Sequence, residues 1–279
     1  MATIMGADEG PSTRSVIFRT KGQRHGPITR LMSPGDLGQH LKPFVFLDLF
    51  QGNLLRGGGM GLHPHSGIGT VTVLVEGDMT FDDEIDGRGA IDYGGVEWMR
   101  AGGGVWHGKE LSPGKSENTT GFQLWVALPP ELENSEPQSQ YLESSAIPDL
   151  APARLIVGSY GGAQSPVKAP AGLNYLLVTL AAGESWTYAP PEGHKVAWIA
   201  VATGQLAGAT PVATGELAVF DDSAAPVVLT GGPSGVKFVL GSAIPFPHNL
   251  HLGYYSVHTS ATALAAGERR IQELSQAFR

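Results

Sequence analysis

Alternation of apolar and polar residues runs through most of this chain and predicts short β-strands. The clearest case is residues 121–128, where Phe122, Leu124, Val126 and Leu128 fall on one face of an extended strand and the intervening residues on the other. Turn-forming residues follow about every 8–12 positions, the spacing typical of a sandwich or barrel. Other apolar or alternating stretches before residue 130 lie at 13–20, 44–50, 68–75, 79–85, 96–100 and 105–107.

The strand pattern stops between residues 131 and 147, where Pro, Glu, Ser and Gln predict a linker. It resumes in a form that resembles a degenerate repeat of the first half, at residues 154–157, 175–180, 185–188, 196–201, 217–220, 227–230 and 236–240. We therefore expect an N-terminal domain over residues 1–130, the linker over 131–147 and a degenerate second domain over 148–279.

The end of the chain changes from strand to helix periodicity. Leu264, Ile271, Leu274 and Phe278 fall near helical spacing and can form one apolar stripe. Thr259 or Ser260 precedes this stripe and suits a helix N-cap. We expect one terminal helix of three to four turns, docked on a barrel.

Composition supports a β-rich globular protein and excludes several functions. The 279 residues include 39 glycines and 20 prolines, only 16% are charged, and the net charge is −8. No run of Lys and Arg is present, so we expect no direct binding to nucleic acid. The absence of cysteine excludes thiolate ligands and fits a reducing compartment. With no apolar run of about 18–20 residues and no secretory signal, we expect a soluble cytoplasmic protein.

Three histidines stand out as candidate metal ligands. His63 and His65 are two residues apart, so on a strand they point to the same side. Pro64 between them cannot donate a hydrogen bond to a neighbouring strand, so the alternative is that both histidines lie in a turn or on the surface. An antiparallel partner strand would bring His107, which follows a glycine-rich turn, beside them. Three imidazoles converging inside a barrel make a transition-metal site.

The remaining histidines of interest suggest structural roles. His194 lies where the second half would repeat the first motif, but it has no partner two residues away. His248, His251 and His258 precede the terminal helix, and we interpret them as hydrogen-bonded histidines at a domain junction.

The sequence around the three histidines resembles the pirin family of the cupin superfamily. Residues 63–67 (HPHSG) resemble the first cupin motif of that family, and residues 97–107 (EWMRAGGGVWH) resemble the second. Residues 43–48 (PFVFLD) and 123–126 (QLWV) match its flanking strands. The resemblance covers most of residues 12–130 and continues more weakly over 150–279. It implies an all-β bicupin, with two tandem antiparallel β-barrels, to which the pattern adds the C-terminal helix.

The resemblance also implies a cofactor and two rival functions. The family binds one metal, usually iron, through three His and one Glu, and its histidine positions correspond to His63, His65 and His107. One implied function is a quercetin 2,3-dioxygenase-type oxidoreductase that uses Fe²⁺ or another divalent transition metal on a small aromatic, flavonol-like substrate. The other is a non-enzymatic regulatory protein with an unidentified protein partner and a lost or altered metal site.

The fourth ligand of the family does not carry over directly. The family places Glu two residues after the third His, but here that position is Lys109 and the Glu follows at Glu110. On a regular strand Glu110 would point away from the face of His107 unless a bulge intervened. The general cupin motif has another Glu after the second His, with three or four residues between them, where this chain has Gly69 and Thr70.

Three arrangements therefore remain open: a bulge delivers Glu110, Glu97 substitutes from across the glycine-rich hairpin, or the site has three histidines alone or no metal. Either glutamate is also a candidate catalytic base. Phe46, Met99 and Trp106 are candidates for the apolar lining. A third function, sugar-phosphate isomerisation, would need basic residues at the barrel mouth, where only Arg56, Arg100 and Lys109 are candidates.

Overall fold

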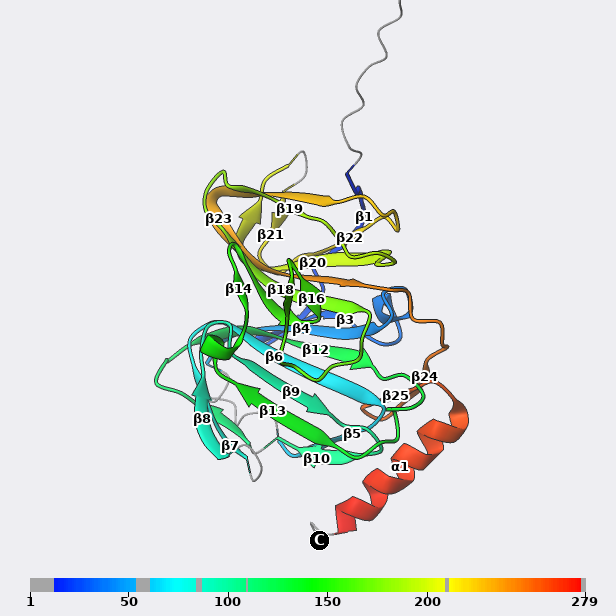
Figure 1. The fold of residues 1–279 in the computed structure, drawn as a ribbon. Helices are drawn as coiled ribbons and strands as arrows, with labels where there is room; N and C mark the ends of the chain where they lie inside the picture. The colour runs from blue at the N-terminus through cyan, green and yellow to red at the C-terminus, as the bar shows by residue number, and fades with distance from the viewer. Residues whose placement is uncertain (1–12, 54–60, 84–86, 109, 209–210, 277–279) are drawn as a thin grey trace, which may run out of the picture.

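The structure is a computed structural model that describes residues 13–53, 61–83, 87–108, 110–208 and 211–276. It is mostly β, with a C-terminal helix, as the alternation predicts (Figure 1). Two large antiparallel sheets dominate it, and smaller sheets and hairpins pack around them. We call the seven-stranded sheet of the first half the first sheet, and the nine-stranded sheet of the second half the second sheet.

The first sheet carries the segments that flank the three histidines. In spatial order its strands are β13 (Gln138–Leu142), β9 (Val96–Arg100), β6 (Ile68–Glu76), β12 (Thr119–Ala127), β4 (Phe44–Gly52), β3 (Ile28–Met32) and β2 (Gln23–His25). Two smaller sheets accompany it: β5 (His63–His65) with β10 (Val105–His107), and β11 (Leu111–Pro113) with β7 (Met79–Asp83) and β8 (Gly87–Ile91).

The second sheet includes a strand from the beginning of the chain. Its order is β1 (Val16–Thr20), β22 (Leu217–Phe220), β20 (Val196–Leu206), β23 (Val227–Ala243), β18 (Leu173–Leu180), β15 (Ala153–Val157) and β14 (Asp149–Leu150); β19 (Ser185–Tyr188) also pairs with β23, and β21 (Val212–Ala213) with β20. A short hairpin of β16 (Ser159–Tyr160) and β17 (Ala163–Gln164) lies outside it. Because β1 pairs with β22, the N-terminal strand contributes to the second sheet.

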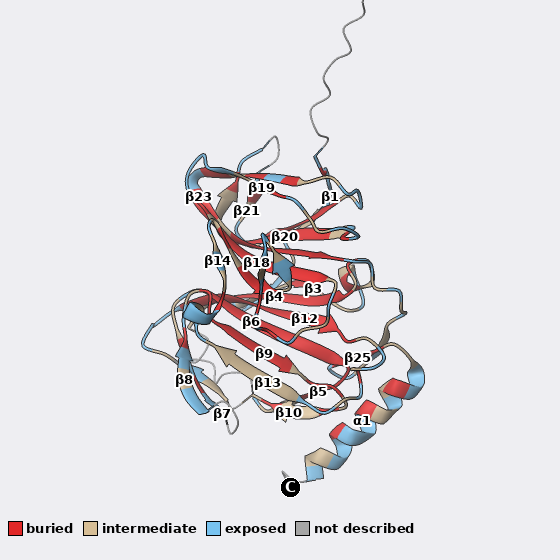
Figure 2. Cartoon of the chain, in the orientation of Figure 1, coloured by how far each residue is buried: buried red, intermediate tan, exposed pale blue. Residues whose placement is uncertain are grey.

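The largest hydrophobic core lies between the two sheets, where Figure 2 shows the strands almost wholly buried. On β12, Phe122, Leu124 and Val126 belong to this core, as the alternation predicts. Phe44 of the first sheet packs edge-on against Trp198 of the second, with ring centroids 5.4 Å apart. Burial of this shared apolar surface holds the two halves together.

The face of the first sheet that points away from the second sheet carries polar side chains. Gln123 and Trp125 alternate with the core residues of β12, as Thr70 and Thr72 do on β6, so these side chains point away from the second sheet. The small β5–β10 sheet, which carries the three histidines, packs on this side. The polar positions of the alternation thus define the side of the sheet on which a site can form.

The segment expected to be a linker contains ordered structure. Residues Gln138–Leu142 form β13, which pairs with β9 at the edge of the first sheet. Upstream of it, Glu133 is buried. The side chains of β13 are all half-buried, so no apolar alternation marks the strand in the sequence.

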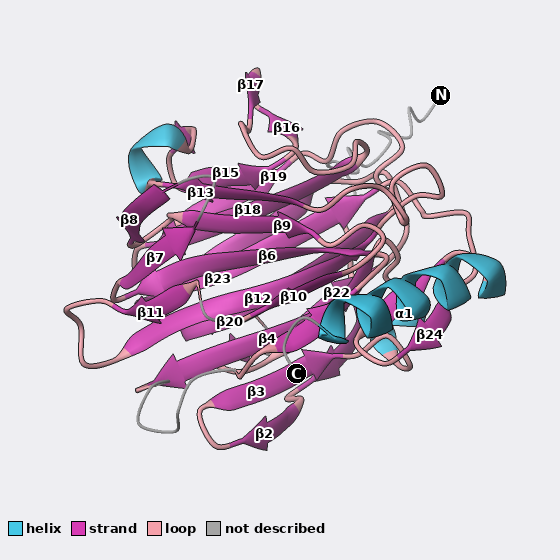
Figure 3. Ribbon diagram, turned by 90° about the horizontal axis from the view of Figure 1, so that it is seen from below, coloured by secondary structure: helices cyan, strands magenta, loops and turns pink. Residues whose placement is uncertain are grey.

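The C-terminal segment returns to the first half after the second sheet is complete. A hairpin of β24 (His251–Gly253) and β25 (Ser256–His258) leads into α1 (Ala261–Ser275), which lies along one edge of the molecule beside β24 (Figure 3). Ser260 caps the helix by accepting a hydrogen bond from the Ala263 backbone N–H, which confirms one of the two expected caps. Within the described residues, no helix has the length and apolar character needed to cross a membrane.

Candidate metal centre

Strand pairing brings the three histidines together as the spacing predicts. His63 and His65 are the ends of β5, and they point to the same side because Pro64 lies between them. β10 pairs with β5 in antiparallel register, with His107 opposite His63. The short ladder therefore tolerates Pro64, which pairs opposite Trp106.

The three imidazoles form a compact cluster. Ring centroids are 4.4 Å apart for His63 and His107, 4.8 Å for His63 and His65, and 5.0 Å for His65 and His107. One donor nitrogen from each ring lies within 4.8 Å of the other two. His65 and His107 are buried and His63 is half-buried, so the cluster is closed on one side and accessible on the other.

Hydrogen bonds fix the protonation of two of the rings. The Nδ1 atom of His65 lies 3.0 Å from the Tyr255 carbonyl oxygen, and that of His63 lies 2.8 Å from the Gly61 carbonyl oxygen. A carbonyl can only accept, so both Nδ1 atoms carry a proton, and in the neutral form of each ring Nε2 keeps the lone pair. The Nε2 atoms of His65 and His107 are buried without a hydrogen-bond partner. Buried, unpartnered lone pairs that converge are what a metal ion requires of neutral histidine ligands.

The electrostatics of the cluster keep His65 and His107 neutral. Burial, reinforced by the neighbouring histidines, lowers the pKa of His65 to about 3. Burial also lowers the pKa of His107 to about 4, while Glu110 acts in the opposite direction. At neutral pH no proton has to leave these two rings before they bind a metal.

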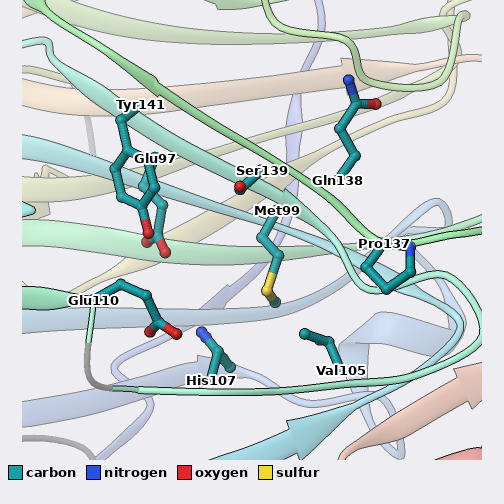
Figure 4. Close-up of a pocket in the computed structure, with 9 residues that line it drawn as sticks. All are labelled: Glu97, Met99, Val105, His107, Glu110, Pro137, Gln138, Ser139 and Tyr141. Carbon is teal, nitrogen blue, oxygen red and sulfur yellow. The ribbon is translucent and has the colours of Figure 1, made fainter. Parts of the chain in front are cut away.

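Both candidate carboxylates lie in one cavity with His107. This cavity of about 180 Å³ is lined by Glu97, Met99, Val105, His107, Glu110, Pro137, Gln138, Ser139 and Tyr141. In Figure 4 the carboxylate of Glu110 points toward the His107 ring, while Glu97 and Tyr141 enter from the first sheet. The structure therefore places both glutamates beside one of the three histidines.

Glu110 lines this cavity from a position just beyond the end of β10. β10 ends at His107, and Gly108 then adopts a φ of 125°, which breaks the strand alternation. The Glu110 carboxylate accepts a hydrogen bond of 2.7 Å from the Gly108 backbone N–H. A regular strand would point Glu110 away from His107, but β10 ends at His107, before that position is reached. Lys109, the position in which the family has its Glu, lies outside the described residues.

The other carboxylate position of the cupin motif is excluded by packing. A Cβ atom at Gly69 would lie 2.2 Å from the Trp98 ring, so this position admits no side chain. Thr70, the alternative position, points away from the second sheet, where its buried hydroxyl has no hydrogen-bond partner. Within the described ranges, the grouped donors that could hold a metal are the three histidines alone.

A second, larger cavity meets the cluster at His63. It has a volume of about 580 Å³ and shares no lining residue with the smaller cavity. Phe46 and Trp125 form part of its wall, stacked with centroids 4.0 Å apart. Its other lining residues are Ile28, Arg30, Pro34, Gly35, Asp48, Gly61, Gln123, Leu252, Gly253, Tyr254, Tyr255 and Ser256.

Of the three residues expected to line the site, two do so. Phe46 lines the larger cavity and Met99 the smaller one. Trp106 does not: it alternates with His107 on β10 and donates a hydrogen bond of 2.9 Å from Nε1 to the Ile271 carbonyl of α1. Strand parity gives the physical reason, since neighbours on a strand cannot share a face.

Basic residues at the mouth are poorly represented. Arg100 donates to the Glu136 backbone carbonyl, and Arg56 and Lys109 lie outside the described residues. The basic residue that lines the larger cavity, Arg30, is paired with Asp48 through two hydrogen bonds. This arrangement gives no support to a sugar-phosphate site.

Sequence reasoning missed the contribution of the C-terminal hairpin. Residues 252–256 line the larger cavity, and Tyr255 supplies the carbonyl that orients His65. His258 is buried and hydrogen-bonded to Glu133 and Ser66, which confirms a structural role for this histidine at the junction. No periodicity signals these contacts, because they join residues about 190 positions apart.

Comparison with known proteins identifies the family. The Pirin family model matches residues 26–126, which include all three histidines. The sequence is 31% identical to a pirin-like protein of Caulobacter vibrioides, over 71% of this chain and 76% of that protein. The chain therefore belongs to the pirin family.

Two further relatives are named for an activity. A Pseudomonas aeruginosa protein named "Putative quercetin 2,3-dioxygenase" is 34% identical over 70% of this chain and 73% of its own length. A crystal structure of quercetin 2,3-dioxygenase from Acinetobacter baumannii superposes with a TM-score of 0.82 at 26% identity, covering 94% of this chain and 98% of that one. The chain is thus similar in sequence and fold to proteins of that name.

Proposed function

We propose that this protein is a metal-dependent dioxygenase of the quercetin 2,3-dioxygenase type, acting on a flavonol-like aromatic substrate. The observation that carries the proposal is the cluster of three convergent histidines, two of them with buried, uncommitted Nε2 atoms, beside a cavity with an aromatic wall. The names of two relatives support this substrate class. In this proposal the two sheets, with their surrounding strands, are two cupin barrels, and the first one holds the centre.

We propose Fe²⁺, or another divalent transition metal, as the cofactor. Neutral imidazoles suit iron, nickel, copper and zinc, and His63, His65 and His107 would be the ligands. Two nitrogens on one ion lie at most about 4.2 Å apart, twice a bond of ~2.1 Å, so the 4.8 Å donor set would contract slightly on binding. Fe²⁺ bound there would supply a centre that is both Lewis-acidic and redox-active for the reaction of the flavonol with O₂, whereas Zn²⁺ would supply Lewis acidity alone.

The carboxylates of the smaller cavity would provide the fourth ligand and the base. Glu110 is the better placed ligand, because its carboxylate points toward His107 and accepts a hydrogen bond from the Gly108 N–H (Figure 4). Glu97 would accept the proton of a substrate hydroxyl that reaches the histidines. A hydroxylated ring that loses this proton binds a cation more strongly and is more easily oxidised.

The larger cavity would orient the substrate. The stacked pair of Phe46 and Trp125 presents a flat apolar surface, which favours a planar aromatic ring. Gln123, on the same wall, can hydrogen-bond to substrate hydroxyls. Because His63 lines this cavity, a substrate bound here would reach the histidine cluster at His63.

Oxygen uptake with quercetin tests this function. The iron-loaded protein should consume O₂ when quercetin is added, and His63→Ala should lose at least about 100-fold in rate, because it removes a ligand. His25→Ala, at an exposed histidine of β2, is the matched control and should behave as wild type. Absence of uptake, or uptake unaffected by His63→Ala, would refute the enzymatic proposal.

One observation favours the alternative of a non-enzymatic regulatory or interaction protein. Among the described residues, the donors grouped closely enough to bind a metal include no carboxylate. In that case the purified protein would contain little metal, and chelation would leave its melting temperature unchanged. Metal analysis of the protein as purified separates the two functions.

A further inference from the structure

We propose that the C-terminal hairpin, residues 251–258, is a working part of the metal centre in the first half, with Tyr255 as a positioning residue for His65. This inference rests on the proposed metal binding and goes beyond it. It assigns a role at the centre to a segment that follows the whole second sheet in the chain.

Backbone contacts join the hairpin to the histidine strand. Ser256 forms a parallel bridge with Ser66, the residue after His65, and the Val257 N–H donates to the Ser66 carbonyl at 3.2 Å. The hydroxyl of Ser66 also hydrogen-bonds to that of Ser256 at 2.9 Å. The hairpin is thus bonded directly to the residue that follows His65.

A buried hydrogen-bonded chain of Ser66, His258 and Glu133, which we call the relay, holds the end of the hairpin in place. His258 bonds through Nε2 to the Ser66 hydroxyl at 2.9 Å and through Nδ1 to the Glu133 carboxylate at 3.1 Å. Glu133 also accepts hydrogen bonds from the backbone N–H and the hydroxyl of Thr259, at 2.6 and 2.7 Å. Ser66, His258 and Glu133 are each at most 3% exposed, so displacing any of them would leave buried polar groups without partners.

Helix α1 packs tightly over this relay at Gly267. A Cβ atom there would lie 2.5 Å from the Ser66 hydroxyl and 2.7 Å from His258 Nε2. Glycine within a helix costs about 1 kcal/mol relative to alanine. Its presence at this contact indicates that close approach to the relay outweighs helix propensity.

Tyr255 combines an unfavourable backbone with two contacts to the histidines. Its φ is 53°, and among the described residues it is the one non-glycine with a positive φ. This conformation turns its carbonyl toward His65 Nδ1, at 3.0 Å, while its ring centroid lies 5.7 Å from that of His63. Glycine would adopt this backbone at lower cost, so the retained tyrosine indicates that the ring is also used.

The carbonyl of Tyr255 would control how His65 binds a metal. It holds the proton on Nδ1 and orients the ring, so that Nε2 points into the cluster. Outer partners of this kind typically change metal affinity by about 10–100-fold. The ring of Tyr255, in turn, covers part of the larger cavity beside His63.

Substitution of Tyr255 by glycine and by proline separates the carbonyl from the ring. Both variants lose the ring, but glycine keeps a φ near 53°, whereas proline forces φ to about −65° and turns the carbonyl away. We expect Tyr255→Gly to bind Co²⁺ within about threefold of wild type. Tyr255→Pro should bind it about 10–100-fold more weakly and shift the visible absorption of the bound Co²⁺. Gly162→Pro, in the β16–β17 turn, is the control for a forced change of φ away from the centre.

A second variant keeps the proposal testable if Tyr255→Pro does not fold. Glu133→Gln preserves the shape of the relay but removes the charge, and should weaken Co²⁺ binding about tenfold and shift the same absorption bands. Equal Co²⁺ binding by Tyr255→Gly and Tyr255→Pro, or an unchanged spectrum in Glu133→Gln, would overturn the role of the hairpin while wild-type binding still supports the proposed function. If wild type itself binds no Co²⁺, the proposed function and this inference both fail.

Discussion

The two halves of the molecule use the space behind their sheets in opposite ways. Behind the second sheet, aliphatic and aromatic side chains such as Leu176, Phe238 and Leu240 fill the interior. Behind the first sheet, the corresponding side holds the three histidines, two threonines and two cavities. The interior behind the second sheet is mainly one apolar core, whereas the side behind the first sheet combines two smaller apolar clusters with unpartnered polar groups that lower stability and can bind a ligand.

The buried polar residues behind the two sheets also differ in whether they have hydrogen-bond partners. In the second half, Ser242 bonds to Tyr188 at 2.6 Å and to His194 at 2.9 Å, and Asn174 bonds to Tyr188 at 3.1 Å. Behind the first sheet, by contrast, His65, His107, Thr70 and Thr72 each have a buried atom without a partner, while Tyr175 and Trp198, the unpartnered aromatic residues of the second half, lie in the core between the sheets. Satisfied groups stabilise a fold, and unsatisfied ones that converge mark a candidate site.

The largest expected effect on stability comes from emptying the packed interior. Phe238→Ala removes a fully buried ring of β23 and should lower the free energy of unfolding by about 3–5 kcal/mol. Metal affinity of the folded variant should be unchanged, because the ring lies behind the second sheet. Urea unfolding and a metal titration at low temperature measure both, and a matching loss of metal affinity would contradict the separation of roles.

Acid should destabilise the metal-free protein through the first half. The pKa values of His65 and His107 in the folded protein are about 3 and about 4, below the usual value of 6.5. As pH falls below 6.5 the unfolded chain takes up protons before the folded protein does, so stability is lost progressively from pH 6.5 toward 3. Urea unfolding in the presence of a chelator at pH 7.5 and 4.5 checks this.

The matched control for the acid prediction is the double variant His65→Leu, His107→Leu. It should lose a clear part of the stability difference between the two pH values, although burial also lowers the pKa of His194 and His258. An unchanged difference would show that these two imidazoles do not titrate as proposed.

Breaking the hydrogen-bonded network around Ser242 should lower the free energy of unfolding by less than emptying the core does. Ser242→Ala leaves Tyr188 and His194 without their shared partner in a buried environment. We expect a loss of about 1–3 kcal/mol in the free energy of unfolding. Thermal and urea denaturation give the value, and a neutral result would mean that the network adds nothing to the second half.

The smallest expected effect is a gain in stability, from the variant Thr72→Val. Thr72→Val replaces a buried hydroxyl that has no partner with a methyl group of similar shape. We expect a gain of about 1 kcal/mol. A loss as large as that of Ser242→Ala would show that the first interior is as well satisfied as the second, which would remove the contrast between the halves.

Local patterns predict the strands and the shared side of His63 and His65, because both depend on neighbours in the chain. His107 joins them because β10 pairs with β5, a pairing that the motif order suggested and strand parity then completes. The cap at Ser260 follows from local chemistry in the same way.

Features that depend on distant contacts could not be predicted. β1 pairs with β22, about 200 residues away, and β13 is recognisable as a strand only once β9 is placed beside it. The position of Glu110 depends on where β10 ends and on the φ of Gly108, and the sequence states neither. Tyr255 reaches His65 only because the chain folds back after the second sheet is complete.

Metal content and chelation test the central claim most directly. The protein as purified, or loaded with Fe²⁺ without oxygen, should hold one metal ion per chain, and a strong chelator should lower its melting temperature. For ligand at 100 times its dissociation constant, the lost stabilisation is about 2.7 kcal/mol. His65→Ala should hold no metal and melt at the same temperature with and without the chelator. A wild-type protein that binds no metal, or whose melting temperature does not respond to chelation, would contradict a metal centre in the first half.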